Sequence, residues 1–130
     1  MGLCNTLTAI HNVMDQKSNY ELQLTNITNV LQRLAMQSSD ILTRQSAEMQ
    51  AYLDAHKDEE GYPDEAAIQY VNSDAFNTKF QQQLRQIQVK EQQYNTMKEQ
   101  TQLRYNSANA LQESWEKKID QDEKFFKYMQ

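Results

Sequence analysis

Asp58-Glu59-Glu60-Gly61-Tyr62-Pro63-Asp64-Glu65 decides the fold, because it holds the only proline of the chain and the only glycine besides Gly2. Glycine allows positive φ and proline removes an amide donor, so these two residue types turn or break helices. Neither occurs from residue 3 to 60 or from 64 to 130. The sequence therefore predicts two long helices that fold back on each other at an acidic corner.

The first half of the chain carries a seven-residue repeat of apolar residues. With position a counted in sevens from Ile10 and position d three residues later, eight of the ten slots between residues 10 and 41 are apolar. Such a repeat is typical of a helix that packs along one seam. Beyond residue 41 we expect the seam to move by one residue, to Leu42, Met49 and Leu53, because a straight helix drifts against a strict repeat.

Three polar residues, Lys17, Ser38 and Gln45, occupy a positions of this repeat. A buried polar residue at position a can fix the register of two packed helices. A lysine can instead extend its amino group along the helix surface to water, and we favour this second interpretation.

The second half of the chain predicts a short helix followed by a long one. Pro63 suits a first helical position, and Asp64 and Glu65 suit the positive end of the helix dipole. The segment Asn72-Ser73-Asp74 then reads as a break and a new N-cap. After it, apolar residues spaced by three and four run to the carboxyl end, with gaps at Glu91 and Thr101.

We therefore expect an all-α fold, a single helical-hairpin domain of residues 1–130 that resembles a coiled coil. Its expected parts are a helix over about 5–57, a corner over about 58–73 with a short helix over about 64–71, and a helix over about 74–128. Nearly equal arms favour antiparallel pairing centred near residue 65, which places Tyr20 beside Leu111 and Leu3 beside Tyr128.

Two helices alone leave much of their apolar stripes in water, so a lone hairpin of this length is marginally stable. Self-association into a bundle or a filament is the natural remedy. The residues that we expect to pack within the hairpin or between copies are Leu3, Leu7, Ile10, Tyr20, Leu24, Ile27, Leu31, Leu34, Ile41, Phe80, Ile87, Tyr94, Met97, Leu111, Trp115, Ile119, Phe125 and Phe126.

Charge is concentrated at the corner. Residues 58–75 hold six acids and no base, although the whole chain has a net charge of only −5. The members that we single out are Asp58, Glu59, Glu60, Asp64 and Glu65. Such a cluster is commonly a solvated loop, and it can also meet a basic partner or the second helix of another subunit. Its order lacks the alternation of a calcium loop, so we expect no metal site.

Other functional classes find little support. There is no glycine-rich phosphate loop, and His11 and His56 lack the spacing of a metal site. Cys4 is the only cysteine, and the hexapeptide from Met1 to Thr6 fits an acylation pattern that is easily met by chance. We expect no enzyme, no cofactor, no nucleic-acid partner and no transmembrane segment. The expected protein is soluble, either cytoplasmic or exported without a cleaved signal peptide.

Two roles remain. The first is a structural subunit that assembles with itself; the second is an adaptor or export-linked protein that binds another helical protein through its exposed apolar stripe. In its scarcity of glycine and proline, its proline-containing corner and its apolar carboxyl end, the chain resembles the small helical hairpins that type III and flagellar systems export. That resemblance extends to the general plan, without a specific motif, and it implies subunits that build needles or filaments.

Overall fold

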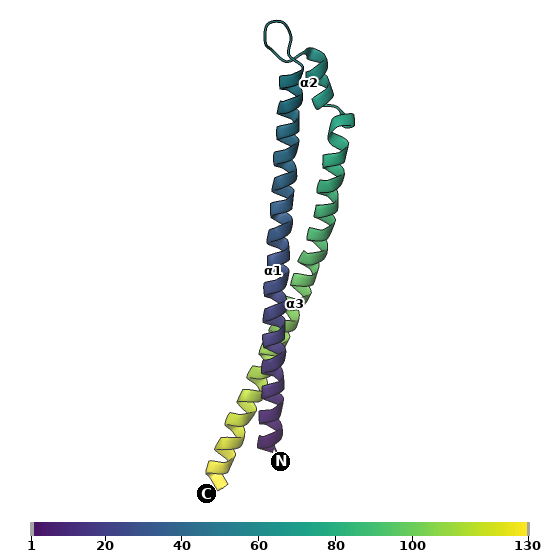
Figure 1. The fold of residues 1–130 in the computed structure, drawn as a ribbon. Helices are drawn as coiled ribbons and strands as arrows, with labels where there is room; N and C mark the ends of the chain where they lie inside the picture. Colours follow the sequence, from purple (N-terminus) through teal and green to yellow (C-terminus); the bar gives the residue numbers. More distant parts are fainter. Residues whose placement is uncertain (1, 130) are drawn as a thin grey trace. The chain divides into compact units, whose positions relative to one another are not determined.

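The computed structural model describes residues 2–129, without the side chains of residues 125, 126 and 129. These residues form three helices and no strand: α1 (Gly2–Ala55), α2 (Glu65–Val71) and α3 (Asp74–Met129) (Figure 1). The protein is an all-α helical hairpin, as the sequence predicts. α1 begins and ends slightly earlier than the expected 5–57, whereas α2 and α3 lie within one residue of their expected bounds.

The seven-residue repeat sets which side of α1 is buried. Counting in sevens from Thr6 to residue 41 gives six positions. Tyr20 is half-buried, and the other five are the buried residues of α1: Thr6, Val13, Ile27, Leu34 and Ile41. The a positions from Ile10 to Tyr52 are all half-buried. The expected shift of the seam is wrong at Leu42, which stays exposed while Gln45 keeps the half-buried slot of the strict repeat.

α3 follows the same repeat with more polar residues in it. Its slots counted in sevens from Phe80 are all buried or half-buried: Phe80, Ile87, Tyr94, Thr101, Ala108, Trp115 and Asp122. Thr101 is therefore part of the seam, although the sequence suggests a gap there. Met97 and Leu111 lie outside these slots, three residues after Tyr94 and Ala108, and both remain exposed.

A tight turn joins α1 to the returning arm. The N–H of Gly61 donates to the carbonyl of Asp58 at 3.1 Å, and the N–H of Asp58 donates to the carbonyl of Tyr62 at 2.7 Å. The φ of Gly61 is 86°, the left-handed conformation that ends a three-residue hairpin loop. The carboxylate of Asp58 accepts the N–H groups of Glu60 and Tyr62 at 2.9 and 3.0 Å, which fixes the loop from within.

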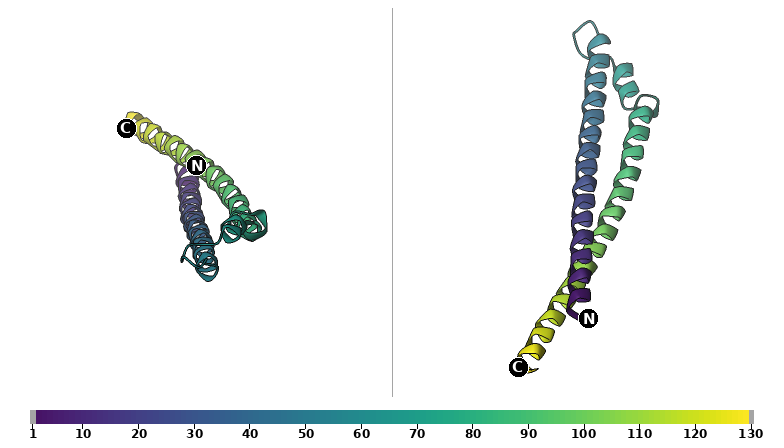
Figure 2. Two further views of the ribbon diagram at one scale, coloured as in Figure 1. Left: turned by 90° about the horizontal axis from the view of Figure 1, so that it is seen from above. Right: turned by 60° about the horizontal axis from the view of Figure 1, so that its bottom comes forward.

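Backbone contacts also connect the residues that precede and follow this turn. Lys57 and Pro63 form an isolated antiparallel bridge, and the N–H of Asp64 donates to the carbonyl of His56 at 2.9 Å. We call residues 56–64 the corner turn, and Figures 1 and 2 show it as a loop that extends from the end of α1. Asp64 then has extended backbone and precedes the first residue of α2.

The chain divides into two compact units. The corner unit is Val30–Tyr94, and the terminal unit combines Met1–Asn29 with Asn95–Gln130. The corner unit contains the main apolar cluster, formed by Leu34, Ile41, Val71, Phe76, Phe80 and Ile87. Val71 brings α2 into this cluster, so three helices share it. Among the described residues of the terminal unit, the buried side chains are Thr6, Val13, Ile27, Thr101 and Ala108.

In the helices next to the corner, the pairing register differs from the expected one. The amide of Gln45 bonds Asn77, whereas a crossover centred near residue 65 places it beside about residue 86. The turn is centred between Lys57 and Pro63, and α2 already belongs to the returning arm. The expected contact between Leu3 and Tyr128 is also wrong, because Tyr128 is 92% exposed.

Candidate association surface

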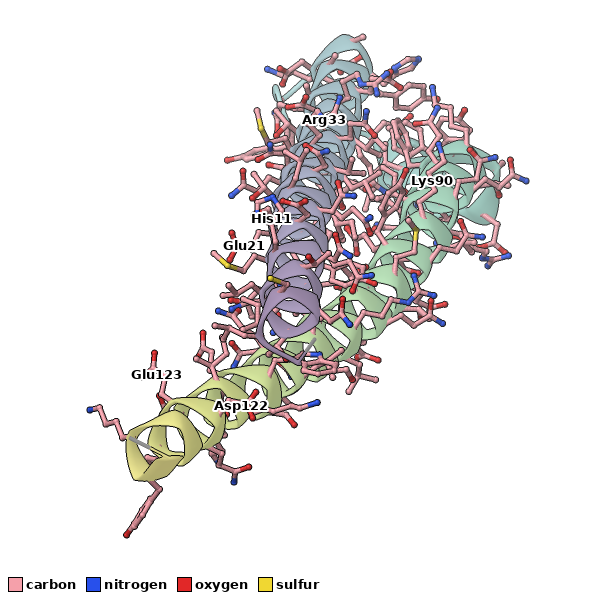
Figure 3. The ribbon with its side chains drawn as sticks, turned by 90° about the horizontal axis from the view of Figure 1, so that it is seen from below. His11, Glu21, Arg33, Lys90, Asp122 and Glu123 are labelled. Atoms are coloured by element: carbon pink, nitrogen blue, oxygen red, sulfur yellow. The ribbon has the colours of Figure 1, made fainter. Side chains whose placement is uncertain are left out.

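The side chains that could carry chemistry are scattered along the helices. Cys4 is exposed and forms no disulfide. His11 is labelled in Figure 3. Its Nε2 lies 4.0 Å from Oδ2 of Asp15, one turn further along α1, and both side chains are exposed. Within residues 2–129, no three His, Cys, Asp or Glu side chains gather closely enough to hold a metal ion. No described helix combines the length and apolar character needed to cross a membrane.

The expected packing residues fall into three groups. The buried ones are Ile27, Leu34, Ile41, Phe80 and Ile87. The half-buried ones are Ile10, Tyr20, Leu24, Leu31, Tyr94, Trp115 and Ile119. The exposed ones are Leu3, Leu7, Met97 and Leu111, and the side chains of Phe125 and Phe126 lie outside the described residues. Packing within the hairpin therefore leaves part of the apolar surface available.

One groove of the terminal unit contains part of this available surface. Tyr20 and Gln16 of α1 line it together with residues of α3, which are Leu103, Arg104, Ser107, Ala108 and Leu111. Leu103 is 67% exposed and Leu111 is 46% exposed. We call this surface the association groove. The predicted proximity of Tyr20 and Leu111 is confirmed, since both line it.

Sequence reasoning missed Leu103. It lies off the seam, so a search for apolar residues spaced by three and four along one stripe passes over it. Its signal is a second spacing, because Leu103, Ser107 and Leu111 follow one another at intervals of four and so share one flank of α3.

Lys17 connects the two helices of the terminal unit. Its Nζ donates to Asn109 Oδ1 and to Gln112 Oε1, both at 2.9 Å, and lies 5.5 Å from the centre of the Tyr105 ring. The amino group therefore makes specific contacts with α3 and does not simply extend to water. Of the two interpretations of this polar a position, the register-fixing one agrees with these contacts.

Asn77 connects all three helices of the corner unit, and the sequence did not single it out. Its Oδ1 accepts a hydrogen bond from Gln45 Nε2 of α1 at 2.7 Å. Its Nδ2 donates at 3.0 Å to the carbonyls of Val71, the last residue of α2, and of Ser73. One amide thus joins α1, the end of α2 and the first turn of α3.

Aromatic rings line the junction of the same three helices. Tyr52 and Tyr70 have ring centres 4.7 Å apart, and those of Tyr70 and Phe76 are 5.6 Å apart. Lys79 crosses nearby from α3 to Glu48 of α1, with its Nζ 2.8 Å from Oε2. Both charged side chains are about half exposed, so the ion pair contributes little stability while it neutralises Lys79.

The acidic corner residues are all exposed. Asp58 uses its carboxylate to organise the corner turn, whereas Glu59, Glu60, Asp64 and Glu65 form no ion pair with any described residue. Tyr62, in the middle of them, is 67% exposed. The corner therefore presents uncompensated negative charge around an accessible aromatic ring.

Comparisons of the chain with protein-family models, with curated proteins and with solved structures find no match. The functional argument therefore depends on the surfaces described above.

Proposed function

We propose that the protein is a non-enzymatic structural subunit that assembles with further copies of the same chain. The observation that carries the proposal is the association groove. Tyr20, Leu103 and Leu111 give it an open apolar lining between two helices of a hairpin. Accessible apolar surface that is rimmed by polar residues is typical of a site of protein association.

A second copy is a suitable occupant, because two hairpins can form a four-helix bundle. The a positions of α1 are half-buried along its whole length, which leaves room for a further helix to complete the seam. Arg104 is the only charged residue that lines the groove; Gln16 and Ser107 are neutral. Two copies can therefore bring these surfaces together with little charge repulsion.

Apolar burial in the groove favours association. Burying one leucine side chain contributes about 1.5–3 kcal/mol, and a two-fold contact uses each groove residue twice. Leu103 and Leu111 together supply enough apolar surface for the equilibrium to respond clearly to their replacement.

We expect sedimentation velocity to show the average mass of the wild-type protein rising with concentration. The double variant Leu103→Glu/Leu111→Glu should need at least about tenfold more protein to associate, because two charges would enter the contact. Both leucines are exposed, so the helical content measured by circular dichroism should not change.

The control is Leu22→Glu, which adds one glutamate to an exposed leucine of the terminal unit outside the groove. It should associate as the wild type does. A wild-type protein that stays monomeric at every concentration would contradict the proposal and favour an adaptor that needs another protein.

A further inference from the structure

A second accessible surface lies on α3 of the corner unit. It is a shallow groove lined by Gln82, Arg85, Gln86, Val89, Lys90 and Gln93, and Lys90 is labelled in Figure 3. All six residues are exposed, whereas Phe80 and Ile87 of the same helix face the apolar cluster. We call this surface the basic groove, because it contains two cations and no acid.

The cations of the basic groove are uncompensated. Arg85 and Lys90 form no ion pair with any described residue, in contrast to Lys79, which is held by Glu48. Val89 lies between them in the sequence and is 49% exposed. The groove thus offers an apolar centre flanked by two available positive charges.

The corner turn has the complementary character. Tyr62 is an exposed apolar ring, and Glu59 and Glu60 precede it as carboxylates without an ionic partner. The turn is held by its internal hydrogen bonds and by the bridge between Lys57 and Pro63. A loop that is already ordered loses little conformational entropy when it binds.

The two surfaces do not satisfy each other within one chain. No described residue of the corner turn lines the basic groove, and the turn is fixed to the end of α1 by its own hydrogen bonds. Opposite charges on separate surfaces of the same molecule can instead be matched between molecules.

We propose that the corner turn of one copy binds the basic groove of another copy, with Tyr62 against Val89 and Glu59 and Glu60 near Arg85 and Lys90. This inference rests on the proposed self-association and adds a second contact to it. The contact joins two different surfaces, so each copy offers one turn and one groove. Repetition of such a heterologous contact builds an open series of copies unless its rotation closes a ring.

Charge reversal on full-length protein tests the contact. The turn variant Glu59→Lys/Glu60→Lys and the groove variant Arg85→Glu/Lys90→Glu change only exposed residues. In sedimentation velocity at low salt, each variant alone should need at least tenfold more protein than the wild type to form species larger than a dimer. An equal mixture of the two should recover them, because each reversed turn then meets a reversed groove.

A chain that carries all four substitutions should likewise assemble as the wild type does, since both of its surfaces change sign together. Large species of the wild type should also decline as sodium chloride rises, because salt screens exposed charges. Individual variants that assemble normally, or a mixture that fails to recover, would overturn the turn-to-groove contact.

The same experiment separates this contact from the association groove. If the charge variants form dimers but no larger species, the result supports both contacts. If they match the wild type while Leu103→Glu/Leu111→Glu is impaired, self-association stands and the turn-to-groove contact is overturned. A wild-type protein that is monomeric at every concentration overturns both.

Discussion

At the scale of single residues, polar side chains in the seam determine how the helices meet. Lys17 and Gln45 both occupy a positions, and both reach specific oxygen atoms of α3. An apolar residue at either position would pack comparably well in several registers. A hydrogen bond, in contrast, requires its partner at one particular position along the facing helix. Asn77 connects all three helices, because it lies in α3 and its side chain bonds Gln45 of α1 and Val71 of α2.

We expect Asn77→Ala to lower the free energy of unfolding by about 1–3 kcal/mol, because the amide of Gln45 and the carbonyl of Val71 both lose the partner that the Asn77 side chain provides. Asn77→Asp should be at least as harmful, since it keeps an acceptor for Gln45 but places a carboxylate against the carbonyls of Val71 and Ser73. Urea denaturation followed by circular dichroism measures both. Asn95→Ala, an exposed amide of α3, is the control and should leave stability unchanged. An Asp variant as stable as the wild type would exclude the donor role of Asn77.

At the scale of elements, the corner turn depends on one backbone conformation. Gly61 has a φ of 86°, and a Cβ placed there would meet no atom within 4 Å. A substitution at this position is therefore opposed by backbone strain alone and not by a clash. The turn sets where the returning arm begins, so its stability contributes to that of the whole corner unit.

We expect Gly61→Ala to lower the free energy of unfolding by about 1 kcal/mol, the usual difference between glycine and alanine at positive φ. Gly2→Ala is the matched control, because Gly2 is helical and its added Cβ would lie 3.5 Å from Asp122 Oδ2, an ordinary contact. That control should be neutral or slightly stabilising, since alanine favours a helix. Urea titration measures the free energy of unfolding of both variants. If Gly61→Ala and Gly2→Ala change it equally, the turn tolerates alanine as well as glycine at residue 61.

The sequence predicted the elements well because local signals define them. Gly61 and Pro63 mark the corner, and the repeat on α1 marks its buried side from Val13 to Ile41. The register next to the corner was missed because equal arm lengths do not reveal that α2 already belongs to the returning arm. On α3, hydrophobicity pointed to Leu111, whereas the helix geometry buries part of Gln112 instead.

Of the candidate surfaces, the sequence revealed one and missed two. The acidic corner could be read directly from the sequence, because its charges are contiguous. The association groove and the basic groove are each formed by residues that are separated in the sequence and lie on one flank of a helix. Their accessibility depends on which side chains are already buried between the two long helices. Leu103 and Val89 are therefore recognised only once the buried side of α3 is known.

At the scale of the whole molecule, the two units differ in the apolar surface that they bury. The corner unit buries a cluster of six apolar residues drawn from all three helices. Among described residues, the buried apolar side chains of the terminal unit are Val13, Ile27 and Ala108. Apolar burial is the main favourable term in folding, so the two units should open with different free energies.

We expect hydrogen exchange to reveal this difference along α1, which contributes residues to both units. Amides of Leu34 to Tyr52 should exchange at least about tenfold more slowly than those of Thr6 to Ile27, because each 1.4 kcal/mol of additional opening free energy slows exchange tenfold. The measurement needs a protein concentration below that of self-association, since contacts between copies would protect the terminal unit. On α3, Phe76 to Ile87 should likewise exchange more slowly than Thr101 to Ile119. Uniform protection along α1 would contradict this expectation, because it would mean that both units open in a single cooperative step.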